Sequence, residues 1–196
     1  MLKIGITGGI GSGKTTVCKV FEILGIPVFY ADTVAKELMV SDPILIAGVK
    51  SAFGTVSYTE SGKLNNQHIA SIVFNNQIEL EKLNALVHPA VFRAFDSWVS
   101  TIPKKVPYTL KEAALLFESG SYQMCDYTIL VTAPVALKIA RVMERDQVSE
   151  AQVMARMDKQ FTDEQKAKMA DYFVQNTNDT SVILQVLELH QQFLSL

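Results

Sequence analysis

The apolar positions at the start of the chain predict a strand, a helix and a second strand. Residues 2–7 form a short apolar run that ends in glycines, which is typical of a buried strand. The next apolar side chains have the spacing of one helix face, and they are Val17, Val20, Phe21 and Leu24. Residues 26–30 again have strand character. Because strand, helix and strand follow one another within the first 30 residues, we expect the two strands to be parallel.

Helical patterns fill the next part of the chain and predict a helical insertion over residues 33–103. Asp42 and Pro43 resemble a helix N-cap followed by a proline at the first helical position. The helices predicted in this insertion cover residues 43–54, 67–74, 78–87 and 89–98.

Strand patterns return after the insertion. The predicted strands cover residues 107–117, with the charged pair Lys111 and Glu112 inside it, 127–131 and 172–175. The predicted helices cover residues 135–145 and the segments after two capping-box patterns, Ser149-x-x-Gln152 and Thr162-x-x-Gln165. A closing amphipathic helix is marked by Ile183, Val186, Leu187, His190 and Leu194. Together these patterns predict an α/β fold, in which residues 1–32 and 104–196 form a parallel sheet of about five strands flanked by helices.

The composition fits a globular protein and excludes several other classes. Hydrophobic residues make up 48% of the chain and charged residues 19%, which argues against disorder. The net charge of -2 argues against nucleic-acid binding, and no uninterrupted apolar run is long enough to cross a membrane. The two cysteines, Cys18 and Cys125, lie far apart and in no metal-ligand spacing. We therefore expect two buried thiols in a reducing compartment, with a cytoplasmic location.

A glycine-rich segment between the first strand and the first helix carries the strongest chemical signal. Residues 8–15 read Gly-Gly-Ile-Gly-Ser-Gly-Lys-Thr and match the phosphate-binding P-loop pattern G-x-x-x-x-G-K-[ST]. Glycines let successive backbone N–H groups point at a phosphate, and the helix N-terminus adds its positive dipole end. Lys14 supplies a cation for the β- and γ-phosphates, and the Thr15 hydroxyl is placed to ligate Mg²⁺. The candidate ATP-binding residues are Gly11, Ser12, Gly13, Lys14, Thr15 and Thr16.

The remaining motifs separate the classes of P-loop protein. The chain contains neither N-K-x-D nor D-x-x-G, which a GTPase needs for guanine recognition and for its switch. A motor-type ATPase would carry an apolar strand that ends in aspartate. The apolar run over residues 113–117 is followed by a glutamate, Glu118. The sequence therefore predicts the P-loop kinase fold and favours a small-molecule kinase.

Asp32 is the candidate catalytic base. It lies just past the second predicted strand, and ligands of parallel sheets sit at the carboxyl ends of the strands. A carboxylate there can accept the proton of a hydroxyl that attacks the γ-phosphate, or hold a Mg²⁺-bound water. The alternative is that Asp32 caps a helix that starts at Thr33, and the two roles do not exclude each other.

Arg141 and Arg145 are candidate residues of a lid. They lie one turn apart on the same predicted helix face, and Arg156 and Lys159 follow. A helical hairpin over about residues 141–160 could close over the site, exclude water and stabilise the charge that develops during phosphoryl transfer. The alternative is a solvated charged face, with Glu144 and Asp146 as ion-pair partners.

With these residues assembled, residues 2–178 resemble the dephospho-coenzyme A kinase family. The matching motifs occur in the family's order. They are residues 7–16, Ala31-Asp32, His88-Pro89, Leu115-Leu116-Phe117-Glu118, Arg141-x-x-x-Arg145-Asp146, Arg156-x-x-x-Gln160, and Ala170-Asp171 with Asn176. The P-loop alone is generic, whereas the ordered series is much more specific.

The resemblance implies phosphorylation of the ribose 3′-hydroxyl of dephospho-coenzyme A (dephospho-CoA) by ATP and Mg²⁺. It also implies a core sheet, a helical substrate-binding domain and a helical lid. The family roles carried onto matching positions make Asp32 the base and bring Arg141 to the phosphates in transit. They make His88, Phe117 and Glu118 line or support the substrate site, and bring Asn176 near the adenine of ATP.

The chain departs from the family pattern at three positions. Tyr30 stands where an aspartate is usual, Ala114 replaces a proline, and Lys138 replaces a glutamine. Two other functions stay open from the residues alone. One is a kinase for another hydroxyl substrate, such as a nucleoside monophosphate, shikimate or a sugar acid. The other is an ATP-binding regulatory switch, against which Asp32 argues because a switch needs no base for a second substrate.

Overall fold

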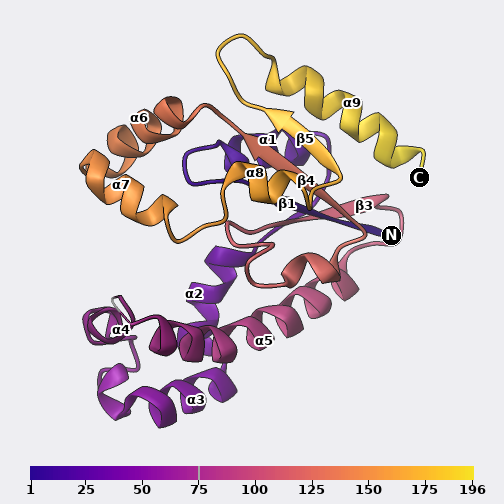
Figure 1. Cartoon of the computed structure of the whole chain (residues 1–196). Helices are drawn as coiled ribbons and strands as arrows, with labels where there is room; N and C mark the ends of the chain where they lie inside the picture. Colours follow the sequence, from indigo (N-terminus) through magenta and orange to yellow (C-terminus); the bar gives the residue numbers. More distant parts are fainter. Residues whose placement is uncertain (75) are drawn as a thin grey trace. The chain divides into compact units, whose positions relative to one another are not determined.

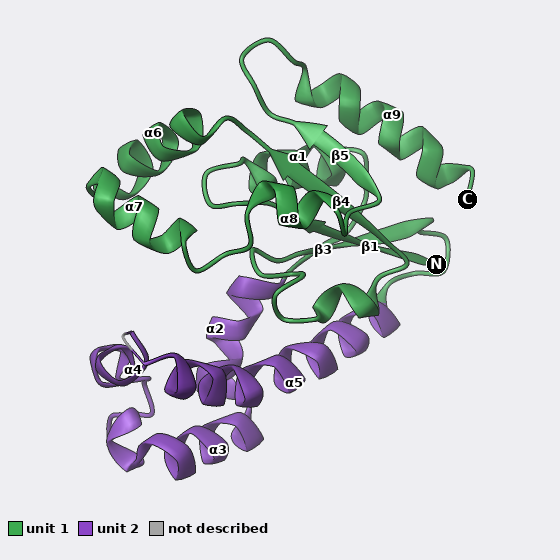
Figure 2. Ribbon diagram, viewed as in Figure 1, with its two compact units in different colours: residues 1–30, 102–196 green, residues 31–101 purple. Residues whose placement is uncertain are grey.

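The computed structural model of the chain describes residues 1–74 and 76–196 (Figure 1). The described chain divides into two compact units, residues 1–30 with 102–196, and residues 31–101 (Figure 2). In the described part of the chain, no helix combines the length and the apolar character that crossing a membrane requires.

The first unit is built on a sheet of five parallel strands in the order β2-β3-β1-β4-β5. The strands are β1 (Leu2–Thr7), β2 (Val28–Tyr30), β3 (Tyr108–Glu112), β4 (Tyr127–Thr132) and β5 (Tyr172–Gln175). This arrangement confirms the predicted α/β fold. Because all strands run the same way, their carboxyl ends meet at one edge of the sheet, and β1 lies between β3 and β4.

The helices of this unit are α1 (Lys14–Ile23), α6 (Val135–Asp146), α7 (Glu150–Met157), α8 (Asp163–Ala167) and α9 (Val182–Leu194), with a short 3-10 helix at Ser121–Met124. The helices α1 and α9 contact each other and bury their apolar faces in the sheet's main core. Both predicted capping boxes form, since the Ser149 and Thr162 hydroxyls accept hydrogen bonds from the backbones of Gln152 and Gln165.

The buried face of α9 differs from the predicted one. Val186, Leu189 and Phe193 are buried, whereas Ile183 and Leu194 lie on the exposed side. The ring of Phe193 packs edge-on against Tyr108 of β3 and Tyr172 of β5. Two apolar stripes on α9 have helical spacing, and contacts with the sheet select the one that carries the large aromatic ring.

The predicted strand over residues 107–117 is wrong at its carboxyl end. β3 stops at Glu112, and residues 114–119 form turns. The apolar side chains of Leu116 and Phe117 are nevertheless buried, which explains why the segment looks like a continuous strand in the sequence. Glu112, and not Glu118, is therefore the acid that ends this strand.

The second unit is helical, as predicted. It contains α2 (Ala31–Ser41), α3 (Pro43–Phe53), α4 (Asn66–Val73), α5 (Gln77–Thr101) and a 3-10 turn at Thr55–Ser57. The predicted cap at α3 forms, because the Asp42 carboxylate accepts hydrogen bonds from the N–H groups of Ile44 and Leu45. The helices enclose a small core that includes Leu45, Val49 and Phe53.

A single helix replaces the two that were predicted around Pro89. α5 runs from Gln77 to Thr101 with Pro89 inside it. A proline in a helix removes one backbone hydrogen bond, and this usually ends or bends the helix. Here Ala90, Val91 and Phe95 are buried directly after the proline, so side-chain packing holds the helix together through it.

Candidate active site

The phosphate loop connects β1 to α1 and depends on its glycines. Gly11 and Gly13 have φ angles of 79° and 92°, in the region that favours glycine. A Cβ on Gly11 would collide with the backbone oxygen of Lys138, and one on Gly13 would collide with the Asn176 amide. The loop therefore needs glycine at both positions for its backbone conformation and for the close approach of neighbouring segments.

The start of α1 has the features of an anion site. Gly13 occupies the N-cap position, and within the described residues no side chain caps the helix there. The Lys14 ammonium donates to the Gly8 carbonyl at 3.0 Å, and Thr15 and Thr16 follow in the first turn of α1. Uncapped N–H groups, the helix dipole and a lysine together can hold the phosphates of a nucleotide.

Arg141 and Asn176 are brought to this loop from distant parts of the sequence. The Asn176 amide, just after β5, donates to the Ser12 carbonyl at 2.9 Å. The Arg141 guanidinium on α6 lies 3.4 Å from the Gly11 carbonyl and 3.3 Å from the Asn176 side-chain oxygen. The phosphate loop, α6 and the segment after β5 thus form one hydrogen-bonded cluster, which places two predicted site residues together.

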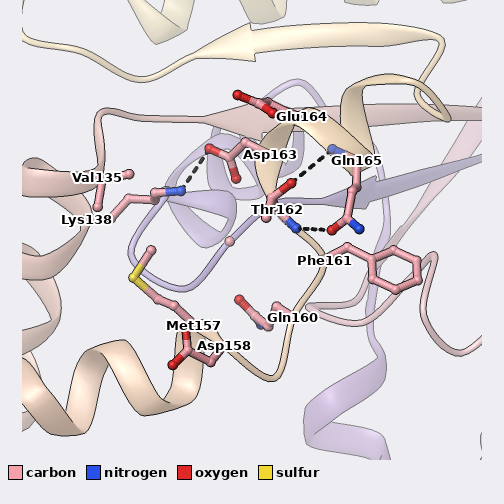
Figure 3. A pocket seen from close by; sticks show the side chains of 11 residues that line it. Val135, Lys138, Met157, Asp158, Gln160, Phe161, Thr162, Asp163, Glu164 and Gln165 are labelled. Carbon is pink, nitrogen blue, oxygen red and sulfur yellow. Dashed lines mark hydrogen bonds and ion pairs between the residues drawn. The ribbon is translucent and has the colours of Figure 1, made fainter.

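A cavity of about 570 Å³ opens beside the phosphate loop and contains residues that the sequence analysis did not assign (Figure 3). Its lining includes Gly9, Lys138, Gln160, Thr162 and Asp163. The Lys138 ammonium is almost fully buried and forms an ion pair with Asp163 at 2.8 Å, as Figure 3 shows. The Gln160 side chain accepts a hydrogen bond from the Ile10 N–H at 2.9 Å.

These cavity residues connect the loop to α6 and to the start of α8. In the sequence, only the departure from the family pattern at Lys138 pointed to that residue. No local pattern links Lys138 on α6 to Asp163, which lies 25 residues later.

Glu118 and Phe117 lie in the turns after β3. Glu118 accepts a hydrogen bond from the Phe161 N–H at 2.8 Å and pairs with the fully buried Lys166 ammonium at 3.1 Å. The Phe117 ring is buried and packs against Tyr122. Glu118 therefore positions the segment before α8, which lines the cavity, whereas Phe117 packs against the 3-10 helix that follows the turns.

Arg145 forms a different contact from Arg141, although it lies only one turn further along α6. Its guanidinium is largely exposed and binds the Asp146 carboxylate, at 2.7 Å and 3.1 Å. Arg156 of α7 binds the same carboxylate at 2.7 Å. The hydrogen bond from Arg145 lowers the pKa of Asp146 to about 2. The contacts of Asp146 with Arg145 and Arg156 join the ends of α6 and α7. Of the two arginines on α6, only Arg141 contacts the phosphate loop in the described residues.

Asp32 and His88 belong to the second unit. Asp32 is exposed and is the second residue of α2, which begins directly after β2. The helix therefore starts two residues earlier than the N-cap alternative supposed. His88 lies inside α5 and stacks on the Phe92 ring, with 6.2 Å between ring centroids.

Glu112 is a further carboxylate that the sequence analysis did not assign to the site. It is buried at the carboxyl end of β3, and its carboxylate lies 3.9 Å from the Lys14 ammonium. In the sequence, the signal for Glu112 was an acid at the end of a strand next to β1. The apolar run over residues 113–117 hid this signal, because it made the predicted strand longer than β3 is.

Comparisons with known proteins identify the family of this chain. The family model described as dephospho-CoA kinase matches residues 2–181. A dephospho-CoA kinase from Salinibacter ruber is 44% identical over 177 residues, which cover 90% of this chain and 89% of the relative.

Solved structures are also similar to this chain. A crystal structure of a Thermus thermophilus protein is 32% identical, with a TM-score of 0.85, and the match covers 97% of this chain and 96% of that one. The dephospho-CoA kinase from Campylobacter jejuni is 26% identical, with a TM-score of 0.72 and coverage of 98% and 97%. With the phosphate loop, Arg141 and Asn176 assembled as described, the chain belongs to the dephospho-CoA kinase family.

Proposed function

We propose that this protein transfers the γ-phosphoryl group of ATP to the ribose 3′-hydroxyl of dephospho-CoA, giving coenzyme A and ADP. The observation that carries the proposal is the match of the dephospho-CoA kinase family model to residues 2–181, nearly the whole chain. The phosphate loop supports it, because its glycine conformations and uncapped helix start suit a nucleotide donor. The free thiols, one of them buried, support a cytoplasmic location.

The donor side of the reaction is assigned to the phosphate loop. Residues 11–16 hold the phosphates of ATP, with Lys14 at the β- and γ-phosphates. Asn176 holds the loop in place through the Ser12 carbonyl, and the segment that carries it lies toward the adenine. The fixed contacts of the loop favour binding, because the backbone donors need no rearrangement to meet the phosphates.

The acceptor side is assigned to Asp32, His88, Phe117 and Glu118. Asp32 takes the proton of the 3′-hydroxyl as this oxygen attacks the γ-phosphorus. The helical unit from residue 31 to 101 forms the substrate-binding insertion, and His88 contributes to it. Glu118 acts through the segment that it holds in front of α8, and Phe117 acts through its packing against Tyr122.

Mg²⁺ is the metal that we propose for the nucleotide complex. The hydroxyl of Thr15, at the start of α1, is an oxygen donor of the kind that Mg²⁺ prefers, so the residues present fit this ion. When bound, Mg²⁺ neutralises charge on the β- and γ-phosphates.

The experiment that tests the function is ADP release by purified protein with ATP and Mg²⁺ across a panel of acceptors. We expect strong stimulation by dephospho-CoA, and weak or no stimulation by AMP, shikimate and sugar acids. A phosphate on the 3′-oxygen of the product, identified by ³¹P NMR, would complete the assignment. Equal ADP release with and without every acceptor would instead favour the regulatory switch, and stimulation by another acceptor alone would identify a different kinase.

Arg141→Ala should lower kcat more than it raises the KM for either substrate. The guanidinium lies at the phosphate loop, where it can stabilise charge that appears only during transfer. We expect kcat to fall by about 10²-fold, in the range observed for single charge-stabilising donors. Steady-state kinetics with both substrates varied will measure the split.

Arg145→Ala is the matched comparison, because it removes the same side chain one turn away on α6, where the partner is Asp146. We expect a much smaller change in kcat from it. An effect of Arg141→Ala confined to KM, or equal effects of the two variants, would contradict a transition-state role for Arg141.

A further inference from the structure

Glu112 occupies the point where β3 meets the phosphate loop. In the parallel pairing of the two strands, Glu112 is opposite Ile6, one residue before the end of β1. The next residue, Ala113, donates its N–H to the Ile6 carbonyl at 3.1 Å and so continues this alignment. The Glu112 carboxylate is therefore held by the sheet itself at the edge where ligands of parallel sheets bind.

The surroundings of Glu112 favour a cation next to its carboxylate. The side chain is 9% exposed, and the Lys14 ammonium lies 3.9 Å from its carboxylate. A buried carboxylate is costly without compensating positive charge. In P-loop proteins this lysine contacts the β- and γ-phosphates of the nucleotide. When Lys14 makes those contacts, a metal ion bound to the same phosphates can supply positive charge to Glu112.

Tyr30 strengthens the case from the neighbouring strand. Tyr30 ends β2 and pairs directly with Glu112 of β3. A tyrosine phenol is uncharged at neutral pH, so this side chain cannot replace a carboxylate. Among the five strands of the described sheet, β3 alone ends in a carboxylate, that of Glu112.

We propose that Glu112 holds the Mg²⁺ of the nucleotide complex, directly or through a bound water, together with the Thr15 hydroxyl. This inference rests on the proposed function only in requiring a Mg²⁺–ATP complex at the phosphate loop. Both groups are hard oxygen donors, and both belong to the elements that flank the loop, β3 and α1. Glu112 thus takes the position that the strand-end acid has in other P-loop proteins.

The test measures nucleotide binding and needs no acceptor, so a failure of the proposed acceptor would leave its result intact. ATP affinity is determined by calorimetry for wild type and Glu112→Gln, each with Mg²⁺ and with EDTA. In wild type, Mg²⁺ should strengthen ATP binding. In Glu112→Gln this gain should shrink by about tenfold or more, as found when outer ligands of metal sites are removed. The ATP affinity in EDTA should change much less.

A second readout follows the metal itself. Mn²⁺ binding to the protein–ATP complex, measured by electron paramagnetic resonance, should weaken in Glu112→Gln by a similar factor. Glu188→Gln is the matched control, since it removes an exposed carboxylate from α9 of the same unit. It should leave both readouts unchanged.

The competing role of Glu112 is that of an ion-pair partner for Lys14 and nothing more. In that case Glu112→Gln would alter ATP affinity equally with Mg²⁺ and with EDTA, and the proposal would be overturned. Circular dichroism will show whether the variant folds. If it does not fold, Glu112→Asp takes its place, because aspartate keeps the negative charge on a side chain that is one methylene group shorter. An unchanged gain from Mg²⁺ and unchanged Mn²⁺ binding in Glu112→Asp would overturn the proposal as well.

The position of the carboxylate can also be moved. Adding Tyr30→Asp to Glu112→Gln returns a carboxylate to the adjacent, directly paired position on β2. We expect the double variant to recover part of the gain in ATP affinity that Mg²⁺ produces. A purely structural role for Glu112 would give no such recovery, and its absence in a folded double variant would count against the proposal.

Discussion

Replacing Asp32 by asparagine should lower kcat by about 10²-fold or more, the loss expected when a general base is removed. The asparagine keeps the size of the side chain and cannot accept the proton of the attacking hydroxyl. Asp32 lies in the first turn of α2 and is exposed, so the change should leave the fold intact. ATP affinity should remain close to that of wild type, because the phosphates are held by a different segment, residues 11–16.

The measurement pairs steady-state kinetics with calorimetric titration of ATP. Glu37→Gln is the matched control, because it removes an exposed carboxylate from the same helix, α2. We expect its kcat to stay within about twofold of wild type, as for most surface substitutions. Near-normal turnover of Asp32→Asn would assign Asp32 to stabilising the start of α2, where acidic side chains favour the helix dipole.

Replacing Lys166 by methionine should destabilise the first unit by about 3–5 kcal/mol, the cost of breaking a buried ion pair on one side. The Lys166 side chain is fully buried, and its ammonium binds the Glu118 carboxylate at 3.1 Å and the Ala114 carbonyl at 3.0 Å. Methionine fills a similar volume but leaves the carboxylate, which is 13% exposed, without its cation. Urea unfolding followed by circular dichroism measures the loss.

Two further variants separate the ion pair from simple packing. Lys168→Met changes an exposed lysine just past α8 and should alter stability by less than about 0.5 kcal/mol. Adding Glu118→Gln to Lys166→Met removes the unpaired charge and should restore part of the stability, while the amide oxygen can still accept from the Phe161 N–H. A loss below about 1 kcal/mol in Lys166→Met would show that water compensates the Glu118 charge.

The activity of these variants bears on the site as well. The Phe161 N–H bound by Glu118 directly precedes Thr162 and Asp163, which line the cavity beside the phosphate loop. Because the Lys166 ammonium holds the Glu118 carboxylate that makes this contact, we expect Lys166→Met to affect the geometry of the cavity in addition to the stability of the unit.

The parts of the fold that the sequence predicts correctly depend on neighbours in the chain. The phosphate loop, the Asp42 cap and both capping boxes are short patterns in which backbone conformation and side-chain partner lie within a few residues. The parallel order of the strands follows from the alternation of strands and helices, because parallel strands need long connections.

The errors arise where distant contacts decide between local alternatives. Pro89 would normally end a helix, yet burial of the side chains after it carries α5 through. The apolar run after Glu112 has the composition of a strand, yet it turns away and buries Leu116 elsewhere in the unit. On α9, helical spacing permits two faces, and contact with Tyr108 and Tyr172 selects the one with Phe193.

For the site, the sequence by itself determined that the chain has a phosphate-binding loop, because the backbone turns of the glycines and the lysine side chain act together within eight residues. It also identified Arg141 and Asn176 as candidates. Only the tertiary structure decided that Arg141, and not Arg145, reaches the loop, and that Lys138 and Asp163 pair beside it. It alone brought Glu112 to Lys14, because the distance between two side chains 98 residues apart depends on how β1 and β3 pair, and no local pattern records that pairing.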